Sequence, residues 1–375
     1  MKGLMIDSDR IVFLLTSTQE PYLRDALDLM FYPSGVEYRF RYDKKWLSPE
    51  LKSSDGRISN ENVKKLVGMK ALLIFILTEK KNDQYLIHEF LPIREATIHD
   101  AKPLGEFLWL SFILGDWVVY HQESLEGEVN EHNEALKSHI PKNSREVVKQ
   151  LVFFAEKPDV ETIPEEFTGG SEDVLNNWTI IAGHMSRFSR VLTDFKQKLI
   201  FTKLVSLREI DNNAPICAKL IDSNQRGFEL KAGRSYSMDI AEYCGQKVEP
   251  FEIKIKTQED KIAPILDRVE VRGKYDRLQF MINCKEVRDT CISALSLEPP
   301  VIEDYLISKP MLQLKIKVSR WRNVWLPLLL FAFSTFITSE QLLQSFVGQP
   351  INYLLLGISA LGTIGSTISL LLLKT

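Results

Sequence analysis

The spacing of apolar and polar residues changes several times along the chain, and each change predicts a different kind of element. Near the N-terminus, Val36, Tyr38, Phe40 and Tyr42 alternate with charged residues. A period of two is typical of a strand that buries one face. We therefore predict a half-buried strand whose aromatic rings fill the core.

Two arginines, Arg39 and Arg41, lie on the opposite face of that predicted strand. Aromatic rings together with basic side chains are typical of proteins that bind single-stranded nucleic acids. Here the alternation sends the rings and the arginines to opposite sides, so we expect no nucleic-acid binding by this strand. The two arginines can contact an anionic ligand, although an exposed pair on a solvated face is the commoner case.

This strand belongs to a predicted first unit over 1–125. Apolar runs at 11–18, 71–78 and 106–120 predict further strands, and helical spacing in 20–32 predicts a helix. A short polar turn between 71–78 and 84–91 predicts a β-hairpin. We expect a small α/β or β-rich domain.

The middle of the chain, 126–212, combines an acidic linker with a predicted long amphipathic helix. Apolar residues recur at alternating steps of four and three from Val174 to Leu199, which is the seven-residue repeat of a packed helix. We place this helix at about 171–204. Its large aromatic residues favour packing across a neighbouring sheet, and an intermolecular coiled coil is the alternative.

Short alternating segments separated by turn residues then follow over 213–319. Their spacing predicts an antiparallel β-sandwich. All four cysteines lie here, at Cys217, Cys244, Cys284 and Cys291, without the paired spacing of a zinc site. We expect reduced thiols and no bound metal.

The last segment, 320–375, is the most apolar part of the chain. We predict two transmembrane helices at about 325–347 and 351–373, because about 20 apolar residues span a bilayer. Basic residues before the first span, together with Lys374 after the second, place both chain ends in the cytoplasm. The predicted membrane-interface anchors are Arg320, Trp321, Arg322 and Trp325.

The two predicted spans differ in their polar residues. The second carries a stripe of small residues at helical spacing, which lets helices approach closely in lipid. This stripe can pack against the first span of the same chain, or it can mediate self-association around a polar path. The residues that we assign to this hairpin site are Glu340, Ser359, Gly362, Ser366 and Ser369.

Composition adds little about chemistry. The chain has 47 basic and 50 acidic residues and a net charge of −3, which excludes a strongly basic nucleic-acid binder as a global property. Nucleotide-binding, metalloprotease and serine-hydrolase motifs are all absent from the sequence. We therefore expect no enzyme activity, no cofactor and no metal.

The predicted class is thus α+β, and the predicted place is the membrane, with two spans and a cytoplasmic N-terminal region. Our leading hypothesis is an oligomerising effector that opens or disturbs the bilayer, for example in antiviral defence. The alternative is a passive membrane-anchored scaffold that recruits a cytoplasmic protein. The expected partners are the lipid bilayer, further copies of the chain, and a cytoplasmic protein or small ligand as trigger.

Overall fold

The computed structural model describes residues 10–18, 22–121, 125–165, 172–189, 198–222, 225–245, 249–258, 260–287, 289–300, 305–318 and 331–339. It is mostly β-sheet, with 53% strand and 21% helix. Two compact units divide the chain. One is Met1–Glu286 with Thr290–Ile316, and the other is Val287–Asp289 with Lys317–Thr375.

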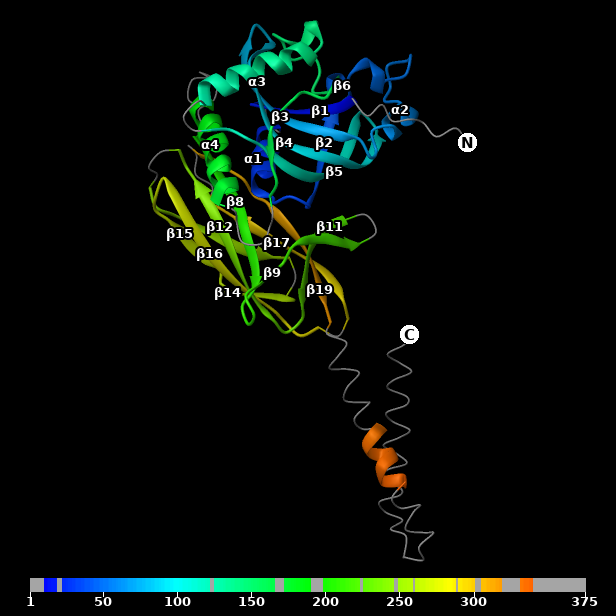
Figure 1. The fold of residues 1–375 in the computed structure, drawn as a ribbon, viewed down its shortest axis with the longest axis vertical. Coiled ribbons are helices and arrows are strands. Elements are labelled where there is room, and N and C mark those ends of the chain that lie inside the picture. Colours follow the sequence, from blue (N-terminus) through cyan, green and yellow to red (C-terminus); the bar gives the residue numbers. More distant parts are fainter. Residues whose placement is uncertain are drawn as a thin grey trace, which may run out of the picture. The chain divides into compact units, whose positions relative to one another are not determined.

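The first sheet of the larger unit has the strand order β2-β5-β4-β3-β1-β6, with β7 paired to β5 (Figure 1). Strands β1 and β3 run parallel, and the chain between them contains α1 (Tyr22–Phe31) and α2 (Asn60–Lys64). Parallel pairing needs such a crossover connection. The strands are β1 (Arg10–Ser17), β2 (Glu37–Asp43), β3 (Lys70–Lys81), β4 (Gln84–Leu104), β5 (Phe107–Val118), β6 (Val152–Glu156) and β7 (Thr162–Ile163).

Two sequence predictions for this sheet are confirmed. Strand β2 buries Tyr38, Phe40 and Tyr42 and exposes Arg39 and Arg41 between them. The predicted hairpin joins β3 to β4 through Asn82 and Asp83, whose φ angles are 50° and 57°. Positive φ at both central residues is the geometry of a tight hairpin turn, which asparagine and aspartate tolerate.

The remaining helices of the larger unit are α3 (Leu125–His139) and α4 (Glu172–Ser189), with short 3-10 turns at Lys44–Trp46, Pro49–Leu51 and Lys142–Ser144. In α4 the predicted repeat buries Val174, Trp178, Ile181 and Met185. This helix contacts β5, β8 (Lys198–Glu209) and β12 (Ser235–Tyr243). Packing across a sheet is therefore confirmed for the described part of the predicted helix.

The predicted end of that helix is wrong. Residues 198–204 lie in β8, whose side chains are buried at nearly every position. A strand buried on both faces has a continuous apolar run, which periodicity cannot separate from a helix. Leu199 fits the seven-residue repeat by chance, and it is instead a buried residue of β8.

Two further sheets complete the larger unit, in the orders β10-β11-β19-β17-β13-β15 and β14-β16-β12-β8-β18, with β9 paired to β8. Alternate residues are buried in β13 and β19, as in sheets that pack face to face. All four cysteines are thiols and not disulfides. The strands not yet named are β9 (Ala214–Pro215), β10 (Ala218–Asp222), β11 (Gln225–Lys231), β13 (Phe251–Thr257), β14 (Ile262–Leu266), β15 (Arg268–Val271), β16 (Tyr275–Cys284), β17 (Cys291–Glu298), β18 (Tyr305–Ile307) and β19 (Met311–Lys317).

The α+β class with a C-terminal transmembrane hairpin is wrong, because the described chain is mostly β-sheet. Apolar content alone does not distinguish a buried strand from a helix. The prediction therefore overestimated the helical content of the chain. Strand β8 lies before residue 213, where the predicted sandwich begins. One of the two later sheets therefore includes residues that we had assigned to the middle segment. The domain boundaries themselves stay predictions.

The membrane assignment is corrected as well. Among the residues that the structure describes, no helix is long and apolar enough to cross a bilayer. Residues 331–339 are helical in the described chain. The predicted spans at 325–347 and 351–373 otherwise lie outside the described residues.

The conclusions that depended on those spans change with them. The two-span membrane localisation and the cytoplasmic orientation are wrong for the described chain, because hydropathy reports apolar content and not the length of a helix. The membrane-opening effector was inferred from the hairpin, and the described residues do not test it. The hairpin and interface residues all lie outside the described part: Arg320, Trp321, Arg322, Trp325, Glu340, Ser359, Gly362, Ser366 and Ser369.

Candidate functional site

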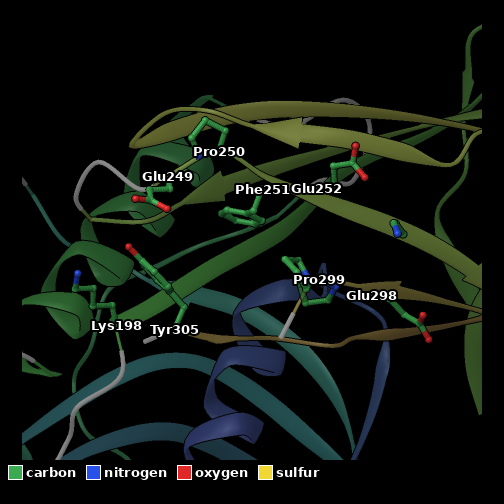
Figure 2. Close-up of a pocket in the computed structure, with 10 residues that line it drawn as sticks. Lys198, Glu249, Pro250, Phe251, Glu252, Glu298, Pro299 and Tyr305 are labelled. Carbon is green, nitrogen blue, oxygen red and sulfur yellow. The ribbon is translucent and has the colours of Figure 1, made fainter. Parts of the chain in front are cut away.

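The candidate site is a cavity at the ends of strands from the two later sheets (Figure 2). Its volume is about 840 Å³. Three prolines and two aromatic rings form much of its wall, and three carboxylates and two amines accompany them. The lining residues are Lys198, Glu249, Pro250, Phe251, Glu252, Lys254, Glu298, Pro299, Pro300 and Tyr305.

One side of the cavity is a stretch of β13 that pairs with no described strand on the β17 side. Residues Phe251–Lys254 pair with β15, but pairing between β13 and β17 begins only at Lys254, opposite Glu298. Strand β17 ends there and Pro299 and Pro300 follow. Proline cannot donate a ladder hydrogen bond, so the chain leaves the sheet at this point.

The backbone of Glu252 faces the gap that β17 leaves. The amide of Ile255 donates to the carbonyl of Asp267 in the β15 direction, at 2.8 Å. Because backbone groups of successive strand residues point to alternate sides, the amide and carbonyl of Glu252 point toward β17. No described residue pairs with Glu252 on this side, so an additional extended chain can add there.

Charges around the cavity are only partly compensated. Glu298 forms an ion pair with Lys256 at 3.3 Å, and the amine of Lys198 lies 5.3 Å from the ring centre of Tyr305. Glu249, Glu252 and Lys254 have exposed side chains and form no ion pair with a described residue. The carboxylates of Glu249 and Glu252 are thus matched in number by the amines of Lys198 and Lys254. Each of these carboxylates can still accept a cationic side chain of a ligand.

A second polar cluster lies in the interior. Arg94 (β4), Glu165 (after β7) and Lys203 (β8) meet around Trp117 (β5), whose ring centre is 4.2 Å from the Arg94 guanidinium and 4.6 Å from the Lys203 amine. Arg94 and Lys203 flank the Glu165 carboxylate, with Arg94 at 3.5 Å. The Trp117 indole donates to the same carboxylate at 2.9 Å.

The pKa values in this cluster follow from burial and pairing. Burial lowers the pKa of Arg94 to about 10 despite the nearby Glu165 carboxylate. Burial also lowers the pKa of Lys203, and Glu165 opposes that shift. For Glu165, burial raises the pKa, but the charges of Lys203 and Arg94 outweigh it and the net pKa is lowered. All three groups are buried and paired with one another, so the cluster offers no ligand site.

A third group, Glu242 on β12, is fully buried without a cation. The Cys244 thiol donates to one of its carboxyl oxygens, and the other oxygen has no hydrogen-bond partner among the described residues. Burial raises the pKa of Glu242 to about 8. It also raises the pKa of the Cys244 thiol far above its usual range. Both groups are therefore protonated at neutral pH, and the thiol is not a nucleophile.

Of the predicted site residues, only Arg39 and Arg41 lie in the described part, on the outer face of β2 and away from the cavity lining. The cavity residues were missed in the sequence. Their signal was present as two segments that place glutamate beside proline, Glu249-Pro250 and Glu298-Pro299-Pro300. Within the described ranges, no group of three or more histidine, cysteine or acidic residues could hold a metal ion.

Comparison with known proteins gives no family. No family model and no curated protein matches the chain. Among solved structures, a Bacteroides ovatus GH5 xyloglucanase in complex with a XXXG heptasaccharide matches 24% of this chain and 17% of its own, at 11% identity and a TM-score of 0.17. Escherichia coli alpha-2-macroglobulin in its native conformation matches 28% of this chain and 7% of its own, at 13% identity and a TM-score of 0.18. Neither likeness carries an argument about function.

Proposed function

We propose that this chain is a recognition module that binds an extended segment of a partner protein, with lysine or arginine side chains, in the cavity beside β13. The observation that carries this proposal is the open stretch of β13 along a cavity of about 840 Å³. An extended peptide can add to such an edge through main-chain hydrogen bonds, while pockets for alternate side chains give specificity.

The proline and aromatic lining supports a peptide ligand. Phe251 and Tyr305, with Pro299, present rigid apolar surface, and rigid surface lowers the entropic cost of binding. The carboxylates of Glu249 and Glu252 then select lysine or arginine side chains. Like the scaffold hypothesis, this proposal has the protein recruit a partner. It assigns no chemical reaction to the protein.

Binding of fluorescein-labelled peptides to the full chain, followed by anisotropy, tests the proposal. The probes are a short peptide of alternating lysine and valine, its glutamate–valine counterpart, and a lysine–valine peptide N-methylated at alternate amides. We expect the lysine–valine peptide to bind best. N-methylation should abolish binding, because it removes the donors of the added strand.

Charge is tested with paired variants. Glu249→Gln/Glu252→Gln should weaken lysine–valine binding by roughly fivefold, the effect of losing two exposed ion pairs. Glu146→Gln/Glu156→Gln removes two exposed glutamates outside the cavity and should leave binding unchanged. Equal affinity for the glutamate–valine peptide, or an equal loss in both double variants, would overturn the proposal.

A further inference from the structure

A second surface lies on the outer face of the first sheet, where β2, β5 and β4 are neighbours (Figure 1). Trp109 on β5 pairs with Arg41 on β2 and with Lys102 on β4. Phe107, two residues earlier, pairs with Leu104 on β4. Directly opposed residues of antiparallel strands share a face, so these side chains form one continuous surface.

The side chains of this surface are open to solvent. Phe107 and Trp109 are 37% and 38% exposed, and Leu104 is 65% exposed. The guanidinium of Arg41 lies 5.4 Å from the ring centre of Phe107 and 5.9 Å from that of Trp109. Exposed large aromatic residues that gather on one face mark interaction sites.

This arrangement corrects the reason given for excluding nucleic acid. Within β2, the rings and the arginines do point to opposite sides. The neighbouring strand β5, however, contributes its own outward rings beside Arg41. Alternation within one strand therefore does not decide which residue types share a sheet face.

One of the three basic side chains on this surface is better placed than the other two to bind an anion. Lys102 contacts Asp100, and Arg39 lies 3.5 Å from the buried Glu37 carboxylate. Arg41 is exposed and forms no ion pair with a carboxylate of the described chain. Arg41 thus lies over the two exposed rings. Its charge also acts on Asp25, and Asp43 lies opposite Phe107 on the same face.

We propose that this surface, defined by Arg39, Arg41, Lys102, Phe107 and Trp109, binds single-stranded nucleic acid. Bases stack on the rings of Trp109 and Phe107, and Arg41 and its basic neighbours contact phosphates. Stacking on an open sheet face accepts any base, because every base has a π face. The surface lies on a different sheet from the cavity and does not depend on the peptide proposal.

Anisotropy of a fluorescein-labelled oligothymidylate with the full chain at low salt tests this surface. Arg41→Gln/Trp109→Ala should weaken binding by on the order of tenfold or more. The matched control is Arg277→Gln/Tyr275→Ala on β16, where Tyr275 is 40% exposed and its hydroxyl accepts from Arg277 at 3.1 Å. This control removes the same residue classes elsewhere and should leave binding unchanged.

Two further measurements separate stacking from charge and from folding. Trp109→Phe should keep most of the affinity, whereas Trp109→Leu should lose it, with both variants showing the circular dichroism of the parent protein. Inorganic polyphosphate should compete poorly with the oligothymidylate.

No oligothymidylate binding at low salt, or equal competition by polyphosphate, would overturn the proposal. A change in sedimentation coefficient with Arg41→Gln/Trp109→Ala in the absence of nucleic acid would instead assign the surface to an interface between copies of the chain.

Discussion

Two buried polar sites in the larger unit accommodate ionisable groups in opposite ways. Around Trp117, the Glu165 carboxylate is flanked by two cations and stays ionised with a lowered pKa. Inside the second pair of sheets, Glu242 has a thiol donor and no cation, and its pKa is raised to about 8. Burial acts in the same direction on both carboxyls, so the neighbouring charges decide which form persists.

The difference has consequences for stability. A compensated buried cluster is strongly coupled, because removing one member leaves the others charged and desolvated. A protonated carboxyl has no such partners, and its effect appears in the pH dependence of unfolding. Three variants test this comparison.

The largest effect is expected from Glu165→Gln. Without the carboxylate charge, Arg94 and Lys203 remain buried as two like charges, which should lower the free energy of unfolding by about 3–5 kcal/mol. Urea denaturation followed by circular dichroism measures the change. Exposed Glu156→Gln is the control, and a loss below about 1 kcal/mol for Glu165→Gln would show that the cluster is not coupled.

A smaller, pH-dependent effect is expected from Glu242→Gln. Between about pH 4.5 and about pH 8, Glu242 is protonated in the folded chain and ionised in the unfolded chain. The folded state therefore binds more protons, and the stability that this group contributes falls as pH rises through that window. Glu242→Gln should flatten the slope of unfolding free energy against pH, with exposed Glu146→Gln as control. An unchanged slope would mean that Glu242 ionises in the folded state.

The smallest effect is expected where the buried contact is neutral. The Tyr32 hydroxyl accepts from the Met311 amide at 2.9 Å and donates to its carbonyl at 3.0 Å, which ties the first sheet region to β19. Tyr32→Phe should cost about 1–2 kcal/mol of unfolding free energy, less than Glu165→Gln and without pH dependence near neutrality. A loss as large as that of Glu165→Gln would remove the distinction between charged and neutral contacts.

Local patterns predicted some elements well. Alternation identified β2, because a half-buried strand leaves a period of two in the sequence. The seven-residue repeat identified the described part of α4. The same repeat failed beyond residue 198, since β8 is buried at nearly every position and leaves no period of two that would identify it as a strand.

The candidate sites were harder to predict because they depend on neighbours that are distant in sequence. The cavity brings Lys198 and Tyr305 beside Phe251, and nothing local to each segment indicates that meeting. Trp109 and Arg41 likewise come together only through the register of β2 and β5. The sequence of each segment shows which residue types it contains, but not which other segment lies beside it in the fold.

By itself, the sequence determined the inward rings of β2 and the amphipathic face of α4, because side-chain period reports local geometry directly. The tertiary structure alone decided which buried charges are compensated, where β13 is left open, and which rings meet Arg41. The physical reason is that charge pairing, desolvation and cross-strand contact depend on which residues are neighbours in space. Residues that are distant in sequence produce no periodic pattern that would reveal such a contact.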